Sequence, residues 1–195
     1  MNSFDWSRGF GLDFDLKRGF SSGAQTTKRR LSQMKGMFHD EAAYEQAVAQ
    51  GDPLVYEFYE LGCPERSGEL AFGTTVLYPG LVGNEYYMTK GHFHTRLMTS
   101  EVYYTLSGSG CMLLENMEGD WKALPMEPGR AVYVPRGYAH RTINTGEVPL
   151  VVLFVFDADA GHDYGTIETK GYRHLVVKGP EGMETVPNPN WNAHV

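Results

Sequence analysis

The chain has 195 residues, of which 42% are hydrophobic and 13% aromatic, so it can bury one sizeable core and is not intrinsically disordered. The formal charge of −7 makes nucleic acid and anionic membranes poor partners, although a small phosphorylated substrate needs only a local group of donors. No apolar run reaches ~18 residues, the length of a membrane span, and the N-terminus lacks the basic start and apolar core of a signal peptide. We therefore expect a cytoplasmic protein whose two cysteines, Cys63 and Cys111, stay reduced.

The first 39 residues are predicted to form an N-terminal extension with edge strands. Apolar and acidic residues alternate over residues 12–16, which favours a short edge strand. Residues 26–31 contain a basic run, which we interpret as a solvated loop or an edge strand because the chain as a whole is acidic. The aromatic residues of this extension make it a candidate for contacts between two subunits.

The clearest helix is predicted over residues 40–50. Asp40 can accept hydrogen bonds at its N-terminus, Gly51 fits the position just beyond its end, and Pro53 prevents its continuation. Its apolar stripe is narrow, so we expect a short peripheral helix that covers the domain from outside.

Beyond residue 54 the pattern changes to strands, which recur about every 8–15 residues with turns between them. Residues 151–156 are apolar throughout, which is typical of a central strand covered on both faces. We predict an all-β jelly-roll barrel over residues 40–175 and a C-terminal tail over residues 176–195, irregular from residue 180. The predicted strands are residues 55–59, 70–78, 86–94, 101–106, 111–115, 131–134, 140–144 and 150–156.

Three histidines and one glutamate stand out in the middle of the chain. His92 and His94 are two residues apart and would project from the same face of a strand. Glu101 lies on the next predicted strand, and His140 begins a later one. If these strands are neighbours in a barrel, the four side chains form a site for a divalent first-row transition metal, with two positions of an octahedral ion left open.

The same stretch resembles the two sequence motifs of the cupin superfamily. It departs from the first motif in two ways: the spacing from His94 to Glu101 is longer than usual, and Tyr86 stands where a glycine is common. Both departures indicate a subgroup of the superfamily. The matching residues are His92, His94, Glu101 and Gly108 in the first motif and Gly129, Pro135, Gly137, His140 and Asn144 in the second.

Within the superfamily, the chain is similar to the cupin-type phosphoglucose isomerases. Residues 88–94 and 159–165 carry this similarity, together with residues 101–103 and 139–142. That family consists of metal-dependent homodimers that interconvert glucose 6-phosphate and fructose 6-phosphate, a step of glycolysis and gluconeogenesis. Gly137 stands where some relatives carry a tyrosine, which leaves the outer wall of the pocket undetermined.

The resemblance implies a homodimeric cupin barrel with one divalent metal ion per subunit, Fe²⁺ in the first place and Mn²⁺, Zn²⁺ or Ni²⁺ as alternatives. It implies that the substrate is a small phosphorylated sugar. Lys90 and Arg96 are the nearest cations that could attract its phosphate. The implied roles are metal ligation by His92, His94, Glu101 and His140, phosphate contacts from Thr75, Thr89 and Gly91, and sugar contacts from Tyr103, His162 and Tyr164.

An isomerase of this kind moves a hydrogen between C1 and C2 of the sugar. We hypothesise that a base takes the C2 proton and that the metal stabilises the resulting cis-enediolate. Glu101 can be that base only if its bond to the metal loosens, because a bound dication makes a carboxylate a weaker base. A hydride shift without a base is the alternative. His162 is suited to the proton transfers that open the sugar ring.

Several points stay open at this stage. In a regular strand Thr89 and His92 would lie on opposite faces, so either a bulge near Gly91 brings them together or Thr89 is not a ligand. His39, His174 and His194 are assigned to surface or structure. The alternative functions are a cupin-type Fe(II) dioxygenase, which we would expect to have a more apolar pocket, and a metal- or sugar-binding cupin without turnover.

Overall fold

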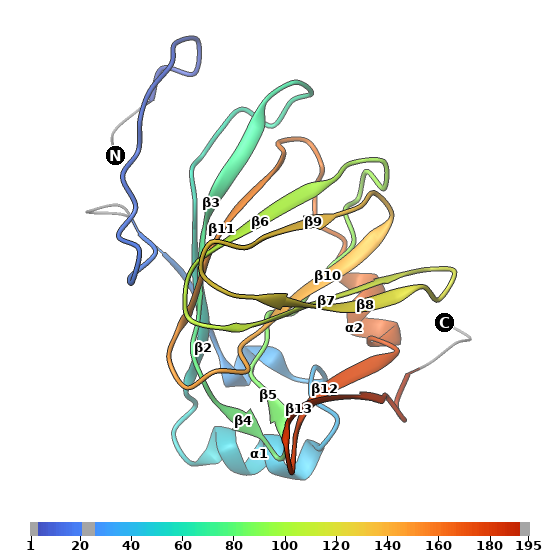
Figure 1. The fold of residues 1–195 in the computed structure, drawn as a ribbon. Coiled ribbons are helices and arrows are strands. Elements are labelled where there is room, and N and C mark those ends of the chain that lie inside the picture. The colour runs from blue at the N-terminus through green and yellow to red at the C-terminus, as the bar shows by residue number, and fades with distance from the viewer. Residues whose placement is uncertain (1–3, 21–25, 192–195) are drawn as a thin grey trace.

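A computed structural model describes residues 4–20 and 26–191 (Figure 1). Two α-helices, α1 (Glu41–Ala49) and α2 (Gly165–Lys170), and a 3₁₀ helix, η1 (Leu31–Met34), accompany the strands. The strands are β1 (Thr27–Arg30), β2 (Leu54–Glu60), β3 (Leu70–Leu77), β4 (Leu81–Val82), β5 (Glu85–Tyr86), β6 (Glu101–Ser107), β7 (Gly110–Asn116), β8 (Trp121–Met126), β9 (Ala131–Val134), β10 (Tyr138–Ile143), β11 (Leu150–Asp157), β12 (His174–Gly179) and β13 (Gly182–Pro187).

The strands form three sheets around one hydrophobic core. A six-stranded sheet has the order β1-β2-β3-β11-β6-β9, a three-stranded sheet the order β10-β7-β8, and a four-stranded sheet the order β13-β12-β5-β4. In Figure 1 the first two sheets face each other across the interior of the barrel, while α1 lies outside at one end. The prediction of an all-β fold with a short peripheral helix is confirmed.

Strand β11 occupies the position that its apolar sequence predicts. It pairs antiparallel with β3 over its whole length and with β6 on its other side, so it is central in the largest sheet. Its inward side chains include Phe154 and Phe156, which are buried, whereas the outward Leu153 and Val155 are only half-buried. The strand therefore builds the inner wall of the barrel, and its outer face is less covered than the sequence suggests.

Helix α1 is also confirmed, with the predicted cap. The Asp40 carboxylate accepts a hydrogen bond from the backbone N–H of Ala43 at 2.9 Å, which satisfies one of the unpaired donors at the start of the helix. Tyr44 is its one buried side chain. The helix therefore covers the barrel end and does not contribute to the site. Within the described part of the chain, no helix is long and apolar enough to cross a membrane.

Two strand predictions near the N-terminus have different outcomes. The basic run at residues 26–31 contains the edge strand β1, which pairs with β2, so its interpretation as an edge strand is confirmed. The strand predicted over residues 12–16 is wrong. The carboxylate of Asp15 instead accepts hydrogen bonds from the backbone N–H groups of Lys17 and Arg18, because a short acidic side chain stabilises a turn more readily than an isolated strand.

Two further predictions are wrong. Residues 86–94 do not form one strand: β5 ends at Tyr86, and beyond it only isolated bridges such as His92 with His140 continue the pairing. The tail is not irregular from residue 180, because β13 pairs with β12 in a hairpin. The division of the chain into an extension, a barrel domain and a tail stays a prediction.

Candidate metal centre and active-site pocket

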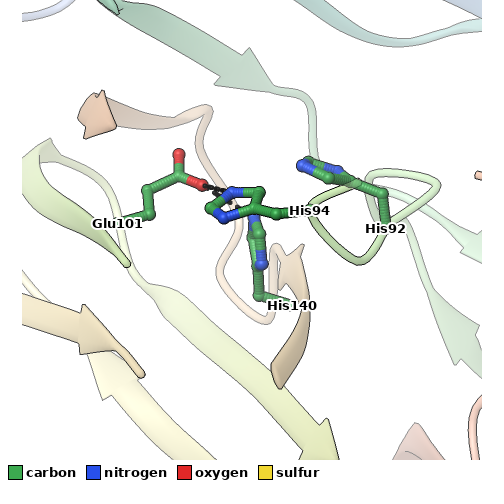
Figure 2. A group of neighbouring side chains, drawn as sticks. All are labelled: His92, His94, Glu101 and His140. Carbon is green, nitrogen blue, oxygen red and sulfur yellow. Dashed lines mark hydrogen bonds and ion pairs between the residues drawn. The ribbon is translucent and has the colours of Figure 1, made fainter. Parts of the chain in front are cut away.

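Four side chains converge inside the barrel from three parts of the chain. Glu101 is the first residue of β6, His140 lies in β10, and His92 and His94 come from the segment between β5 and β6. His92 forms an isolated antiparallel bridge with His140, which brings the two chain segments together. One ligand atom from each of the four residues lies within 4.8 Å of all the others. Figure 2 shows the carboxylate and the imidazoles gathered at one place.

The hydrogen bonds around His94 assign its protonation. The Thr99 hydroxyl donates to the carbonyl oxygen of Arg96 at 2.7 Å, so it can only accept from Nδ1 of His94, 2.9 Å away. Nδ1 of His94 therefore carries a proton, and in the neutral imidazole Nε2 carries a lone pair. This lone pair faces Oε2 of Glu101 at 3.1 Å. Two lone pairs at this distance repel each other unless a cation lies beside both of them.

The surroundings of the other two imidazoles, His92 and His140, also indicate a cation beside them. Nε2 of His140 lies 2.9 Å from Oε2 of Glu101, but at an angle that does not make a hydrogen bond. Nε2 of His92 and both ring nitrogens of His140 are buried and have no hydrogen-bond partner in the described residues. Buried polar atoms without partners are rare and costly. Three imidazoles and one carboxylate are a donor set for a divalent transition metal, so these residues fit such an ion.

The charges in this cluster shift the pKa values in opposite directions. Burial by itself would raise the pKa of Glu101, but the interactions with His140 above all outweigh it and hold the pKa well below its usual value. Burial, followed by repulsion from His140, lowers the pKa of His92 well below its usual value. The carboxylate is thus ionised and the imidazole of His92 neutral, which are the forms that bind a metal.

The cluster opens into a cavity whose empty space, with the adjoining solvent included, is about 580 Å³. Its walls come from β2, β3, β6, β10 and β11 and from the segments before β6 and before α2. The lining residues are Tyr56, Phe58, Glu60, Thr75, Thr89, Lys90, Gly91, His92, Glu101, Tyr103, His140, Thr142, Phe154, Phe156, His162 and Tyr164.

The residues predicted to contact the sugar lie beside this cluster of three histidines and Glu101. Tyr103 follows Glu101 by two positions on the same face of β6, is buried, and has its ring 5.8 Å from that of His140. The rings of His162 and Tyr164 stack at 5.9 Å, and that of His162 is 4.5 Å from the ring of His92. Desolvation lowers the pKa of His162 and raises that of Tyr164 to about 12, so both groups are neutral near pH 7.

Thr89 and His92 line the same cavity, although strict alternation would separate them. Gly91 lies between them with φ +72°, a left-handed conformation that reverses the direction of the following side chain. A Cβ at Gly91 would collide with the Tyr172 hydroxyl and lie 2.9 Å from the carbonyl oxygen of His140. The left-handed backbone and the close approach of Tyr172 and His140 both require glycine at this position. The chain therefore forms an irregular loop here instead of the predicted strand.

Four residues predicted near the phosphate, Thr75, Thr89, Lys90 and Gly91, all line the cavity. The Thr89 hydroxyl oxygen accepts from the backbone N–H of Thr142 at 3.1 Å, which leaves its hydrogen available to a ligand. Lys90 forms an ion pair of 2.8 Å with Glu168 at the rim. The other cation considered, Arg96, pairs instead with Asp157 and Asp159 and is not among the lining residues.

The sequence did not reveal several of the lining residues. Tyr56, Phe58 and Glu60 alternate on the inward face of β2, and the parity of that predicted strand was the signal that could have found them. Thr99 was missed because its contact with His94 depends on the conformation of the loop between them. His39 and His174 lie away from the cavity, as expected, while His194 lies outside the described residues.

Residues 28–192 match the protein family described as Glucose-6-phosphate isomerase (GPI). The chain is 50% identical over 182 residues to a glucose-6-phosphate isomerase of Thermococcus litoralis, with 93% of this chain and 96% of the relative covered. It is 40% identical over 182 residues to one of Sinorhizobium medicae, with 91% and 85% covered. A solved structure of Bacillus subtilis oxalate decarboxylase aligns with a TM-score of 0.45 and 25% identity over 53% of this chain and 26% of that chain. The chain therefore belongs to the cupin-type glucose-6-phosphate isomerase family.

Proposed function

We propose that this member of the family interconverts glucose 6-phosphate and fructose 6-phosphate with the C1–C2 end of the sugar at the four-ligand centre. The phosphate lies at the opposite end of the cavity, beside Thr75, Thr89 and Gly91. The observation that most supports this placement is that the ligand cluster and these hydroxyl and backbone donors line one cavity. A sugar phosphate has one end, C1–C2, whose oxygens gain negative charge during the reaction, and a phosphate end that does not react. The cavity offers the four-ligand cluster to the first end and neutral hydrogen-bond donors to the second.

We propose one divalent transition-metal ion per chain, held by His92, His94, Glu101 and His140, with Fe²⁺ in the first place and Mn²⁺, Zn²⁺ and Ni²⁺ as alternatives. The unpaired nitrogens of His92 and His140 support this ligand set. When bound, such an ion acts as a Lewis acid toward substrate oxygens that gain negative charge.

Glu101 is proposed as the base that moves the proton between the two carbons. Its Oε2 atom faces His94 and His140, and Figure 2 shows the second carboxylate oxygen turned away from them. One oxygen can therefore stay a ligand while the other takes the C2 proton and returns it to C1. The C–H electron pair of C2 becomes the C1–C2 double bond of the enediolate while the electron pair of the C1 carbonyl moves to O1. The proton of the O2 hydroxyl then passes to O1, the C2 carbonyl forms, and the C1–C2 electron pair takes the proton from Glu101 at C1.

Tyr103, His162 and Tyr164 are proposed to handle the other protons of the reaction. Burial and the negative charge of Glu101 raise the pKa of Tyr103 well above its usual value, so it stays a donor to a sugar oxygen. A neutral His162 has one N–H group and one lone pair, which allows it to pass a proton between O5 and O1 during ring opening. Tyr164 stacks on His162 and fixes the plane of the imidazole.

At the other end of the cavity, the hydroxyl hydrogens of Thr75 and Thr89 and the backbone N–H of Gly91 are proposed to bind phosphate oxygens. Because these donors are neutral, they fix the position of the phosphate and do not balance its charge. Lys90 stands at the rim with its ammonium group held by Glu168. Its proposed role is to attract the substrate from solvent.

The function is tested by removing the metal with a chelator and assaying conversion of fructose 6-phosphate before and after each metal is added back singly. We expect loss of activity on chelation and recovery with at least one of Fe²⁺, Mn²⁺, Zn²⁺ or Ni²⁺. A chelated protein that keeps full activity, with no metal found by elemental analysis, would contradict the metal site. No conversion in any state would contradict the isomerase.

We also propose a homodimer acting in the cytoplasm. Large apolar side chains are exposed on the outer face of β6 and β9, where Val102 pairs directly with Tyr133 and Tyr104 lies beside them. An exposed apolar patch on a sheet supports contact with another surface. Sedimentation equilibrium of the chain and of its V102K variant tests this: the dimer is expected to weaken in the variant, and a monomeric parent protein would contradict the proposal.

A further inference from the structure

The basic run at the N-terminal edge of the barrel lies next to the cavity. Arg29 is in β1, directly opposite Tyr56 of β2, a lining residue of the cavity. Directly paired residues in an antiparallel sheet lie on the same face with their Cβ atoms about 5 Å apart. The guanidinium carbon of Arg29 lies 5.9 Å from the centre of the Phe58 ring, and Phe58 is another lining residue. Arg29 is not itself a lining residue, but it lies directly beside two residues that are.

The rim lies at the phosphate end of the cavity, because Phe58 pairs with Thr75 across β2 and β3. Three donors there, Thr75, Thr89 and the Gly91 backbone, carry no charge. The ammonium group of Lys90 is held by Glu168 at 2.8 Å, so it is directed away from a bound phosphate. A dianionic phosphate bound only by these groups would leave most of its charge uncompensated.

Arg141 does not supply that charge. It is buried, with its Nε and Nη2 atoms both donating to the carbonyl oxygen of Lys90, at 3.2 and 2.7 Å. Its guanidinium carbon lies 4.3 Å from the centre of the Tyr172 ring, and it does not line the cavity. Its position supports the loop around Lys90 from behind.

Arg29, by contrast, has no carboxylate partner in residues 4–20 and 26–191. Its hydrogen bonds go to neutral groups: the carbonyl oxygen of Lys28, 3.4 Å from Nη1, and the side chain of Tyr56. Its charge acts on both tyrosines at the mouth: burial raises the pKa of Tyr56 and of Tyr164, and Arg29 opposes the rise in each case. The guanidinium is therefore close to the cavity and available to an anion.

We infer that Arg29 binds the substrate phosphate and supplies the positive charge that the donors at that end lack. This inference rests on the proposed placement of the phosphate beside Thr75 and Thr89. A guanidinium is always charged and offers parallel N–H donors that match two oxygens of a phosphate. Arg29 would thus select a phosphorylated sugar over a neutral one, without touching the carbons that react.

Steady-state kinetics with fructose 6-phosphate, and competitive inhibition by inorganic phosphate, test the inference on the metal-loaded enzyme. For R29Q we expect KM and the inhibition constant of phosphate to rise about tenfold while kcat changes less than about twofold. R29K keeps the charge but not the parallel donors, so a rise of about threefold in KM and in the inhibition constant of phosphate is expected. K28Q is the matched control, because Lys28 carries the same charge on the opposite face of β1, and it should leave all three constants unchanged.

T75V separates this inference from the placement of the phosphate. If T75V raises the inhibition constant of phosphate and R29Q does not, Arg29 is not a phosphate ligand, although the proposed placement stands. If neither variant changes it, the phosphate binds elsewhere and both proposals are wrong. An equal rise in R29Q and K28Q would show a general effect of charge and would also overturn the inference.

Discussion

Nε2 of His94 faces Oε2 of Glu101 at 3.1 Å, while Nδ1 on the other side of the same ring donates its proton to Thr99. The two contacts depend on each other, because in the neutral imidazole a proton on Nδ1 leaves a lone pair on Nε2. Thr99 therefore determines which nitrogen of His94 can bind a metal. The carbonyl oxygen of Arg96, which accepts from Thr99, is the last member of this chain of hydrogen bonds.

Replacing Thr99 by valine is expected to lower the affinity of the site for the metal and to leave the fold intact. The variant keeps the shape of the side chain but removes the acceptor for Nδ1, and loss of such an outer partner costs about 10–100-fold in metal affinity. The affinity is measured by titrating the chelated protein with Mn²⁺ or Zn²⁺. S100A is the control, since Ser100 accepts only an exposed hydrogen bond from Tyr133. Equal metal affinities for T99V and S100A would show that Thr99 does not orient His94.

The role of Glu101 as a base predicts the fate of a deuterium label. When glucose 6-phosphate deuterated at C2 is isomerised in ordinary water, part of the label should be lost from C1 of the product, because a proton held by a carboxylate at an open cavity can exchange with solvent. Mass spectrometry of the fructose 6-phosphate measures this loss. Labelled substrate incubated without enzyme is the control. Complete retention at C1 would favour a hydride shift and rule out the proposed proton transfer.

Gly91 and Gly137 have nearly the same backbone conformation, with φ +72° and +76°, but different surroundings. A side chain at Gly137 meets no atom within 4 Å, so G137A is expected to lose only about 1 kcal/mol of stability from the left-handed backbone. G91A adds collisions with Tyr172 and the backbone of His140 and is expected to lose about 3 kcal/mol or more, together with activity. Urea unfolding of both variants measures the difference, and equal losses would contradict it.

Much of the fold follows from the sequence pattern alone. The central position of β11 and the cap of α1 were predictable because each depends on local residues: an apolar run of strand length in the first case, Asp40 and Gly51 in the second. The path of the segment before β6 could not be predicted in this way. His92 and His94 alternate like strand residues, but Gly91 and isolated bridges determine the actual path of the backbone.

The C-terminal hairpin was missed for a related reason. Prolines and asparagines near the end of the chain suggested irregular structure, but β13 carries only Pro187, at its last position, where a missing N–H costs little. Its partner β12 contributes buried Leu175, Val176 and Val177 to the core. The stability of this hairpin comes from tertiary packing, which local residue preferences do not report.

For the site, the four residues that could hold a metal ion were recognisable from their types and spacing. The roles of His162 and Tyr164 came from the family resemblance, because nothing in their spacing places them beside His92, and the structure now brings them there. Thr99 and Arg29 were not predicted because the position of each near the site depends on a contact that exists only after folding. Thr99 contacts a ring nitrogen of His94, and Arg29 lies opposite Tyr56 in a strand pair.

Anomalous X-ray diffraction from crystals of the active, metal-loaded enzyme tests the four-ligand centre most directly. We predict one strong peak per chain, about 2.0–2.3 Å from Nε2 of His94, an oxygen of Glu101 and a ring nitrogen each of His92 and His140. Data collected on both sides of the absorption edge of each candidate metal identify the element. An active enzyme whose crystals show no peak between these four side chains would contradict the metal centre.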